Sequence, residues 1–322
     1  MQRRAFLGSP LLAPALFTRL SGAIAELPLI STHEHLLSEE ERYASRPDFF
    51  TLADHYAIND LVSAGLPPEN LAPILDRARP ALERWQLFEP FWRHARFTGY
   101  GLALRIAVRD LYKTAEPSAS NIESLNRAIA AANRPGLYHD ILKRRMRLRY
   151  AVLDDYWRGE PVRPNPQFFR LARKFDWFCT PANPAALKRM EEVTGVAISS
   201  LPTLVRALER RFQQSLDAGL TAVKSTIAYQ RDLDFSRPSE QDAAAAFDAL
   251  ARGDASRRRP LEDFMFRQVL RLAADHNLPF QLHTGIQAGN SNTIANSRPL
   301  LLASLLREFP SLRFDLFHTG WP

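Results

Sequence analysis

The sequence predicts an α/β fold, a (β/α)8 TIM-type barrel that is incomplete and contains strands 1 to about 6. Short apolar runs of barrel-strand length recur from residue 148 onward, and clear amphipathic helices separate the later ones. Strand, helix and strand in succession imply a parallel sheet with crossover helices. Short strands that are buried on both faces and repeated this often favour a closed barrel over an open sheet.

Six runs are expected to form the strands: Leu27–Thr32, Tyr150–Leu153, Phe175–Cys179, Thr221–Ile227, Pro279–His283 and Arg313–His318. Helices are expected at Leu204–Ala218 and Phe264–Asp275. An open six-stranded barrel would expose two unpaired edges. We therefore expect the natural protein to continue past Pro322 for roughly two more βα units, so that this chain is a truncated barrel.

The residues from about 38 to 149 are expected to form a helical insertion after the first strand. Trp85, Phe88, Phe91 and Trp92 follow one another at helical spacings, which places them on one helix face as a packing stripe. Residues 26–322 are then a single barrel domain that carries this insertion.

The first 25 residues have the features of an export signal. Arg3-Arg4-Ala5-Phe6-Leu7 resembles the twin-arginine signal, and the apolar stretch that follows is too short to span a bilayer. Ala23-Ile24-Ala25 supplies a small-x-small cleavage site, which makes Glu26 the new N-terminus. This predicts a bacterial protein exported to the periplasm without stable membrane insertion. The alternative is a loose apolar arm on a cytoplasmic protein.

Charge and cysteine content exclude several classes of protein. The formal net charge is +7, but Arg3, Arg4 and Arg19 precede any acidic residue, and from residue 26 the balance is 39 − 35 = +4. Because no basic block alternates with aromatic residues, we expect no nucleic-acid partner. Cys179 is the only cysteine, so the chain can form neither an internal disulfide nor a cysteine-based zinc cage.

Four histidines are expected at the carboxyl ends of strands. His33 and His35 are one residue apart on the first strand, so both imidazoles leave the same face and supply two nitrogen ligands for a divalent metal. His283 and His318 each end an apolar run and are followed by Thr-Gly. The carboxyl ends of barrel strands converge on one face, where active sites are built. The remaining histidines, which lie in helical stretches and are expected to be surface or packing residues, are His55, His94, His139 and His276.

Lys224 lies inside a strand, where an unpaired ammonium is costly to bury. It shares one strand face with Ala222 and Thr226, while Val223 and Ile227 on the other face suit packing against helices. We therefore expect Lys224 to point into the barrel, towards the histidines. The alternative is an edge residue that reaches solvent.

Together these residues resemble the amidohydrolase superfamily, and in particular its branch with uronate isomerases and nodulin-type amidohydrolases. Three segments carry the resemblance: Ser31–Leu36 with the downstream run His55–Leu61, Val223–Tyr229, and Leu278–Pro322 with both His-Thr-Gly turns. The resemblance implies a barrel with one or two divalent metals, zinc or manganese. It also implies an aspartate at the end of an eighth strand, which this sequence does not contain; Asp154 and Asp155 follow an early strand.

The resemblance implies a role for each site residue. His33, His35 and His283 would bind the metal, and Lys224 and His318 would be catalytic. Tyr229, Arg231 and Trp321 would contact a small-molecule substrate. If that substrate is acidic, Lys224 would neutralise its charge. The favoured function is hydrolysis of an amide, ester or lactone by a metal-activated water. The alternatives are a uronate isomerase-like isomerase or a decarboxylase, and an inactive barrel that only binds ligand. The sequence does not indicate the oligomeric state.

Overall fold

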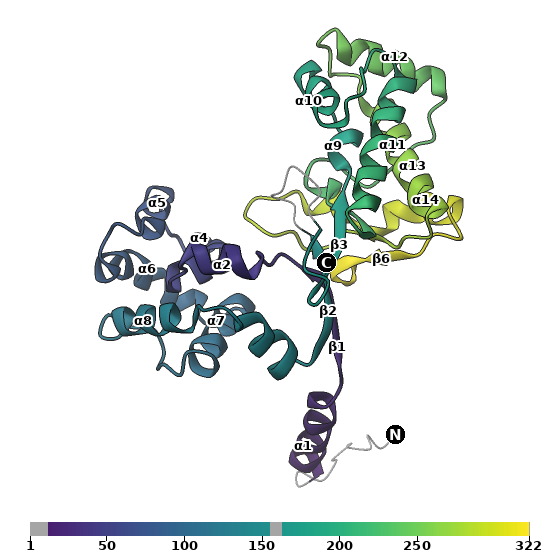
Figure 1. Ribbon diagram of the computed structural model, residues 1–322. Helices are drawn as coiled ribbons and strands as arrows, with labels where there is room; N and C mark the ends of the chain where they lie inside the picture. Colours follow the sequence, from purple (N-terminus) through teal and green to yellow (C-terminus); the bar gives the residue numbers. More distant parts are fainter. Residues whose placement is uncertain (1–11, 155–162, 322) are drawn as a thin grey trace, which may run out of the picture.

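Six parallel strands form one sheet in the order β1-β2-β3-β4-β5-β6 (Figure 1), in a computed structural model that describes residues 12–154 and 163–321. The strands are β1 (Leu29–Glu34), β2 (Leu148–Asp154), β3 (Phe169–Lys174), β4 (Leu220–Ser225), β5 (Phe280–Leu282) and β6 (Phe314–Leu316). Each strand pairs with its neighbours in the chain, and every pairing is parallel. This sequential order is that of the first six strands of a TIM-type barrel, as predicted.

The sheet curls so that its first and fifth strands approach each other. Strands in a flat sheet lie about 4.8 Å apart, which would separate β1 from β5 by roughly 19 Å. Instead, the Gln281 side-chain amide on β5 donates a 2.8 Å hydrogen bond to the Thr32 carbonyl on β1. The curl brings the carboxyl ends of distant strands to one rim.

Helices on the outside of the curl connect the later strands (Figure 1). In chain order the helical segments are α9 (Asp176–Cys179), α10 (Pro184–Thr194), α11 (Leu201–Asp217), η3 (Ile227–Tyr229), α12 (Glu240–Ala251), α13 (Arg259–Asp275), η4 (Ile294–Ser297), η5 (Pro299–Leu302), α14 (Ala303–Glu308) and η6 (Phe317–Gly320). Leu204, Leu208 and Phe212 recur every four residues on α11 and are buried in one core with Val223 of β4. Each such side chain contributes about 1.5–3 kcal/mol through burial.

The chain between β1 and β2 forms a helical lobe beside the sheet (Figure 1). Its segments are α2 (Glu39–Ser45), α3 (Phe49–Asp54), α4 (Ala57–Ser63), η1 (Pro68–Asn70), α5 (Leu71–Leu75), α6 (Ala81–Ala95), α7 (Gly99–Asp110), α8 (Ile122–Ala132) and η2 (His139–Arg145). The predicted stripe on α6 is present: Trp85, Phe88 and Trp92 are buried in the core of this lobe, and Phe91 packs against it half-buried.

The prediction of a strand at Phe175–Cys179 was wrong. The third strand is β3, and residues 176–179 form the short helix α9. A short apolar run does not distinguish a strand from a buried helix by periodicity alone. Phe175 and Phe178 are apolar because they belong to the core under the helices, whereas Arg173 and Lys174 make the real strand look polar.

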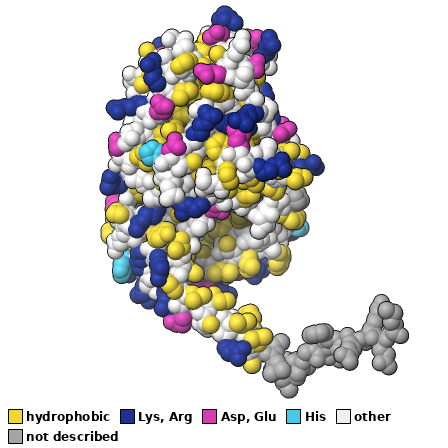
Figure 2. Space-filling model, turned by 90° about the vertical axis from the view of Figure 1, so that its right-hand side faces the viewer, with side chains coloured by type: hydrophobic (Ala, Val, Ile, Leu, Met, Phe, Trp, Pro, Cys, Tyr) yellow, Lys and Arg dark blue, Asp and Glu magenta, His cyan; other side chains and the backbone are white. Residues whose placement is uncertain are grey.

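At the N-terminus, α1 (Leu12–Ala25) is exposed and projects away from the sheet (Figure 1). The arginine pair of the predicted signal, Arg3-Arg4, lies outside the described residues. No helix in the described parts of the chain is both long and apolar enough to cross a membrane. On the face shown in Figure 2, Lys and Arg side chains are scattered among acidic and apolar ones.

Candidate active site

A cavity of about 520 Å³ opens at the rim where the carboxyl ends of the strands meet. Side chains from β1, the ends of β3, β4 and β5, the turn after β6 and the helical lobe surround it. The lining residues are His33, His35, His55, Tyr56, Tyr100, Lys174, Thr226, Tyr229, His283, Ile286, Gln287, Ala288 and His318. All four strand-end histidines named from the sequence therefore face one cavity.

His33 and His35 present their imidazoles to each other. Their Nε2 atoms are 3.1 Å apart, and both side chains are half-buried. His35 Nδ1 lies 2.8 Å from the Asp154 carbonyl oxygen. Because a carbonyl can only accept, this nitrogen carries the proton, and the neutral ring keeps a lone pair on Nε2. A backbone carbonyl that fixes the tautomer in this way is typical of metal-binding histidines.

Burial keeps both rings neutral. Burial, reinforced by the positive charge of Lys224, lowers the pKa of His33 to about 2. The pKa of His35 is lowered as well, chiefly by burial and against the raising effect of Asp154. A neutral imidazole is the form that binds a metal.

Asp154, the last residue of β2, completes a possible ligand group. One ligand atom from each of His33, His35 and Asp154 lies within 4.8 Å of the other two. The Asp154 carboxylate is buried and lies 3.1 Å from the Lys174 ammonium. Ligand atoms about 2.0–2.2 Å from one zinc ion lie roughly 3–3.5 Å from one another. The histidine pair meets this spacing, and Asp154 lies within 4.8 Å of both, so the residues fit a divalent cation.

His283 and His318 form the second half of the cavity wall. Their ring centroids are 4.5 Å apart, and the His33 ring lies 6.4 Å from that of His318. His283 Nε2 donates to the Ile286 carbonyl at 2.8 Å, which leaves the lone pair on Nδ1, and His283 is not part of the group formed by His33, His35 and Asp154. Burial, reinforced by the charge of Lys224, lowers the pKa of His283 to about 4. Its role as a metal ligand stays a prediction.

The two His-Thr-Gly turns pack against each other. His318 and Thr319 have φ angles of 59° and 54°, left-handed values that are costly for residues other than glycine. Gly285, with φ of 68°, lies where a Cβ atom would come within 2.4 Å of the Trp321 carbonyl oxygen. This close approach holds the two turns together and aims His318 at the cavity.

Lys224 points into the curl of the sheet, as expected. The residue is fully buried, and its Nζ lies 3.2 Å from the centroid of the Phe317 ring. Among the described residues, no acceptor lies within hydrogen-bonding distance of the ammonium. Burial lowers the pKa of Lys224 to about 7, although Asp154 raises it in part. Phe317 also contacts His33 through an edge-to-face pair at 4.7 Å.

The three predicted substrate contacts fall in different places. Tyr229 lines the cavity, and its hydroxyl accepts a 2.8 Å hydrogen bond from the Ala288 backbone amide. Arg231 does not line it, since its guanidinium is buried against Asp263 at 2.7 Å and Glu262 at 3.0 Å. Trp321 is 64% exposed and lies outside the lining residues. Arg231 thus joins the segment after η3 to α13 through ion pairs, because the buried carboxylates require a cation.

Several lining residues escape prediction from the sequence. His55, expected to be a surface or packing residue, faces the cavity with its ring 5.9 Å from that of His35. The Tyr56 and Tyr100 rings stack at 4.8 Å beside it. The signal for His55 and Tyr56 lies in the His55–Leu61 run that resembles uronate isomerases. No spacing rule identifies Asp154 and Tyr100, because they come from elements far away in the sequence.

A parallel sheet of sequential strands, with histidines and an aspartate gathered at its carboxyl rim, defines a TIM-type barrel with a possible metal centre. Residues 183–322 match the family model described as amidohydrolase. The match covers 140 of 322 residues, so the chain is similar to this family over its carboxyl-terminal part.

Two curated proteins are similar in sequence. Protein fluG of Emericella nidulans is 28% identical over 143 residues, which cover 39% of this chain and 16% of that protein. A uronate isomerase of Nostoc punctiforme is 25% identical over 297 residues, covering 84% of this chain and 61% of that protein. The chain thus spans less than two thirds of the length of either relative.

The fold matches that of a solved uronate isomerase. The crystal structure from Thermotoga maritima superposes with a TM-score of 0.73 at 16% identity, and the match covers 93% of this chain and 72% of that one. The shared fold includes the helical lobe, because so much of the chain is covered.

Proposed function

We infer that this chain carries the metal site of a divalent-metal-dependent hydrolase that acts on a small carbonyl compound. One observation carries the proposal: the Nε2 atoms of His33 and His35 lie 3.1 Å apart, and Asp154 lies close enough to join them. Zinc is the expected ion, with manganese as the alternative, and one or two ions would be bound.

A divalent ion at this site would supply Lewis acidity and would lower the pKa of a coordinated water to about 7. The chain's own residues would position the substrate. Tyr229 and His318 face the same cavity as the ligand pair and can bond a substrate oxygen through their polar atoms. Lys224 is buried and does not line the cavity; burial lowers its pKa to about 7, so it can give up a proton near neutral pH.

A second candidate, isomerisation of a sugar acid, is favoured by one feature. The chain resembles proteins named uronate isomerases along most of its length, helical lobe included. That lobe places His55 and Tyr56 in the cavity wall. The same ligand pair would serve both reactions.

Product analysis separates the two candidates. Full-length protein loaded with zinc or manganese would be incubated with amides, esters, lactones and uronates in water enriched in ¹⁸O. Hydrolysis predicts the net addition of one water, with ¹⁸O in the new carboxylate, and a second fragment from an amide or an open-chain ester. Isomerisation predicts a product with the elemental composition of the substrate, without net addition of water or cleavage, and that result with uronates alone would overturn the hydrolase proposal.

A further inference from the structure

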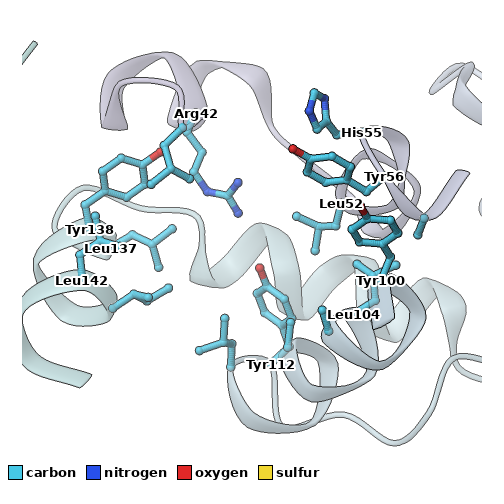
Figure 3. Close-up of a pocket in the computed structure, with 16 residues that line it drawn as sticks. Arg42, Leu52, His55, Tyr56, Tyr100, Leu104, Tyr112, Leu137, Tyr138 and Leu142 are labelled. Atoms are coloured by element: carbon cyan, nitrogen blue, oxygen red, sulfur yellow. The ribbon is translucent and has the colours of Figure 1, made fainter. Parts of the chain in front are cut away.

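A second cavity, of about 330 Å³, adjoins the candidate active site (Figure 3). It lies within the helical lobe, between α2, α3, α4, α7 and η2. The two cavities share His55, Tyr56 and Tyr100 in their walls. A molecule that reacts at the histidines could therefore extend past these rings into the lobe.

The walls of this second cavity are mainly apolar. Leu52, Leu104 and Leu142 line it, together with several alanines. A cavity of about 150 Å³ lined by such side chains holds benzene. A volume about twice as large accommodates a phenyl ring with a short chain, while a polyhydroxylated molecule would lose its hydrogen bonds to water there.

One cation breaks the apolar lining. The Arg42 guanidinium extends into the cavity between Tyr138 and Tyr112 (Figure 3), where its charge acts on the Tyr112 hydroxyl. Within the described parts of the chain, no carboxylate pairs with it, whereas two other arginines of the lobe, Arg84 and Arg96, each contact one. The Tyr138 hydroxyl already donates to the Leu37 carbonyl at 2.7 Å.

A guanidinium has five donors, so Arg42 retains several for a ligand. In an apolar cavity that lacks a protein carboxylate, the complementary group is a carboxylate on the ligand. Charge and shape together select an anion with an apolar body.

We propose that the lobe cavity is a substrate-specificity subsite for an aromatic carboxylic acid, with the ring among the leucines and the carboxylate on Arg42 and Tyr112. This inference rests on the proposed function in one respect, that the reacting carbonyl lies at the histidines. An aromatic carboxylic acid differs from a sugar acid in having an apolar body, whereas a sugar acid is polar along its whole length.

The test is calorimetric titration of the full-length protein with 3-phenylpropionate, with 3-phenylpropanol and glucuronate as comparisons. Ala103→Trp would fill the cavity from an exposed position on α7, and Arg42→Gln would remove the charge. Each is expected to weaken 3-phenylpropionate binding by about tenfold or more. The matched controls are Ala131→Trp on α8 and Arg210→Gln on α11, both exposed and outside the cavity, which should bind as the wild type does.

Three outcomes would overturn the proposal: no binding of 3-phenylpropionate at millimolar concentration, equal binding by Ala103→Trp and its control, or binding of the alcohol as tight as that of the acid. Circular dichroism would establish that each variant is folded. His33→Ala separates the two proposals. If this variant keeps the metal content of the wild type, the proposed function fails, while its affinity for 3-phenylpropionate reports on the subsite alone.

Discussion

The ammonium of Lys224 lies against the face of Phe317, 3.2 Å from the ring centroid, and it has no hydrogen-bond partner among the described residues. A buried cation with so little compensation destabilises the folded chain. Residues that are kept at such a cost cluster at functional sites.

Replacing Lys224 with Met is therefore expected to raise stability and lower activity. The pKa of Lys224 in the folded chain, about 7, lies below the usual value of 10.5. The buried lysine therefore destabilises the folded state fully below pH 7, and this destabilisation decreases as pH rises to 10.5. The variant should be more stable at pH 7 by a few kcal/mol, at most about 5, with turnover lower by roughly 10²-fold. Urea unfolding between pH 6 and 10 measures the first effect; Lys188→Met, on an exposed site of α10, is the control. Wild-type turnover by Lys224→Met would make the lysine a structural residue.

The contact between the two His-Thr-Gly turns predicts the effect of Gly285→Ala. Gly195 has nearly the same φ, 69° against 68°, but no atom lies within 4 Å of the Cβ position there. Gly195→Ala should therefore cost only the backbone strain, about 1–2 kcal/mol. Gly285→Ala should cost more, because the Trp321 backbone must move. Equal losses in urea unfolding would show that the turns do not depend on this approach.

Arg231 is expected to support stability rather than substrate binding. Arg231→Ala would remove the nearer of the two cations beside the fully buried Asp263, the other being Arg259 at 3.7 Å, and should cost about 3 kcal/mol. Arg258→Ala removes a partner of the same Glu262 from a side chain that is 44% exposed, and should cost below about 1 kcal/mol. Thermal unfolding of both variants compares them. A loss of substrate affinity in Arg231→Ala without a loss of stability would restore it as a substrate contact.

The late strands are predictable from sequence, because β5 and β6 each run into His-Thr-Gly and the helix before β5, α13, has a clear period. Strand β3 is not predictable from the sequence, because Arg170, Arg173 and Lys174 interrupt its apolar pattern. Similarly, HxH spacing identifies His33 and His35, but Asp154 joins them only through the pairing of β1 with β2. Ligand groups assembled by tertiary contacts leave no local pattern.

Export by the twin-arginine route remains our proposal for residues 1–25. Replacing both Arg3 and Arg4 with Lys is expected to retain the protein in the cytoplasm, because the arginine pair is the recognised part of the signal. Fractionation of the bacterial cell measures the distribution, and Arg19→Lys is the control. Efficient appearance of the double variant in the periplasm would refute the assignment.

Metal content of the purified full-length protein, determined by mass spectrometry after reconstitution with zinc or manganese, tests the central claim most directly. We expect at least one ion per chain, lost in His33→Ala and in His35→Ala and retained in His94→Ala, which alters an exposed helical histidine. Parallel Asp154→Ala and His283→Ala variants identify the third ligand: the ligand group of the structure predicts loss in the former, and the sequence predicts loss in the latter. A wild-type protein without bound metal, or a His33→Ala variant that binds it as tightly, would contradict the metal site.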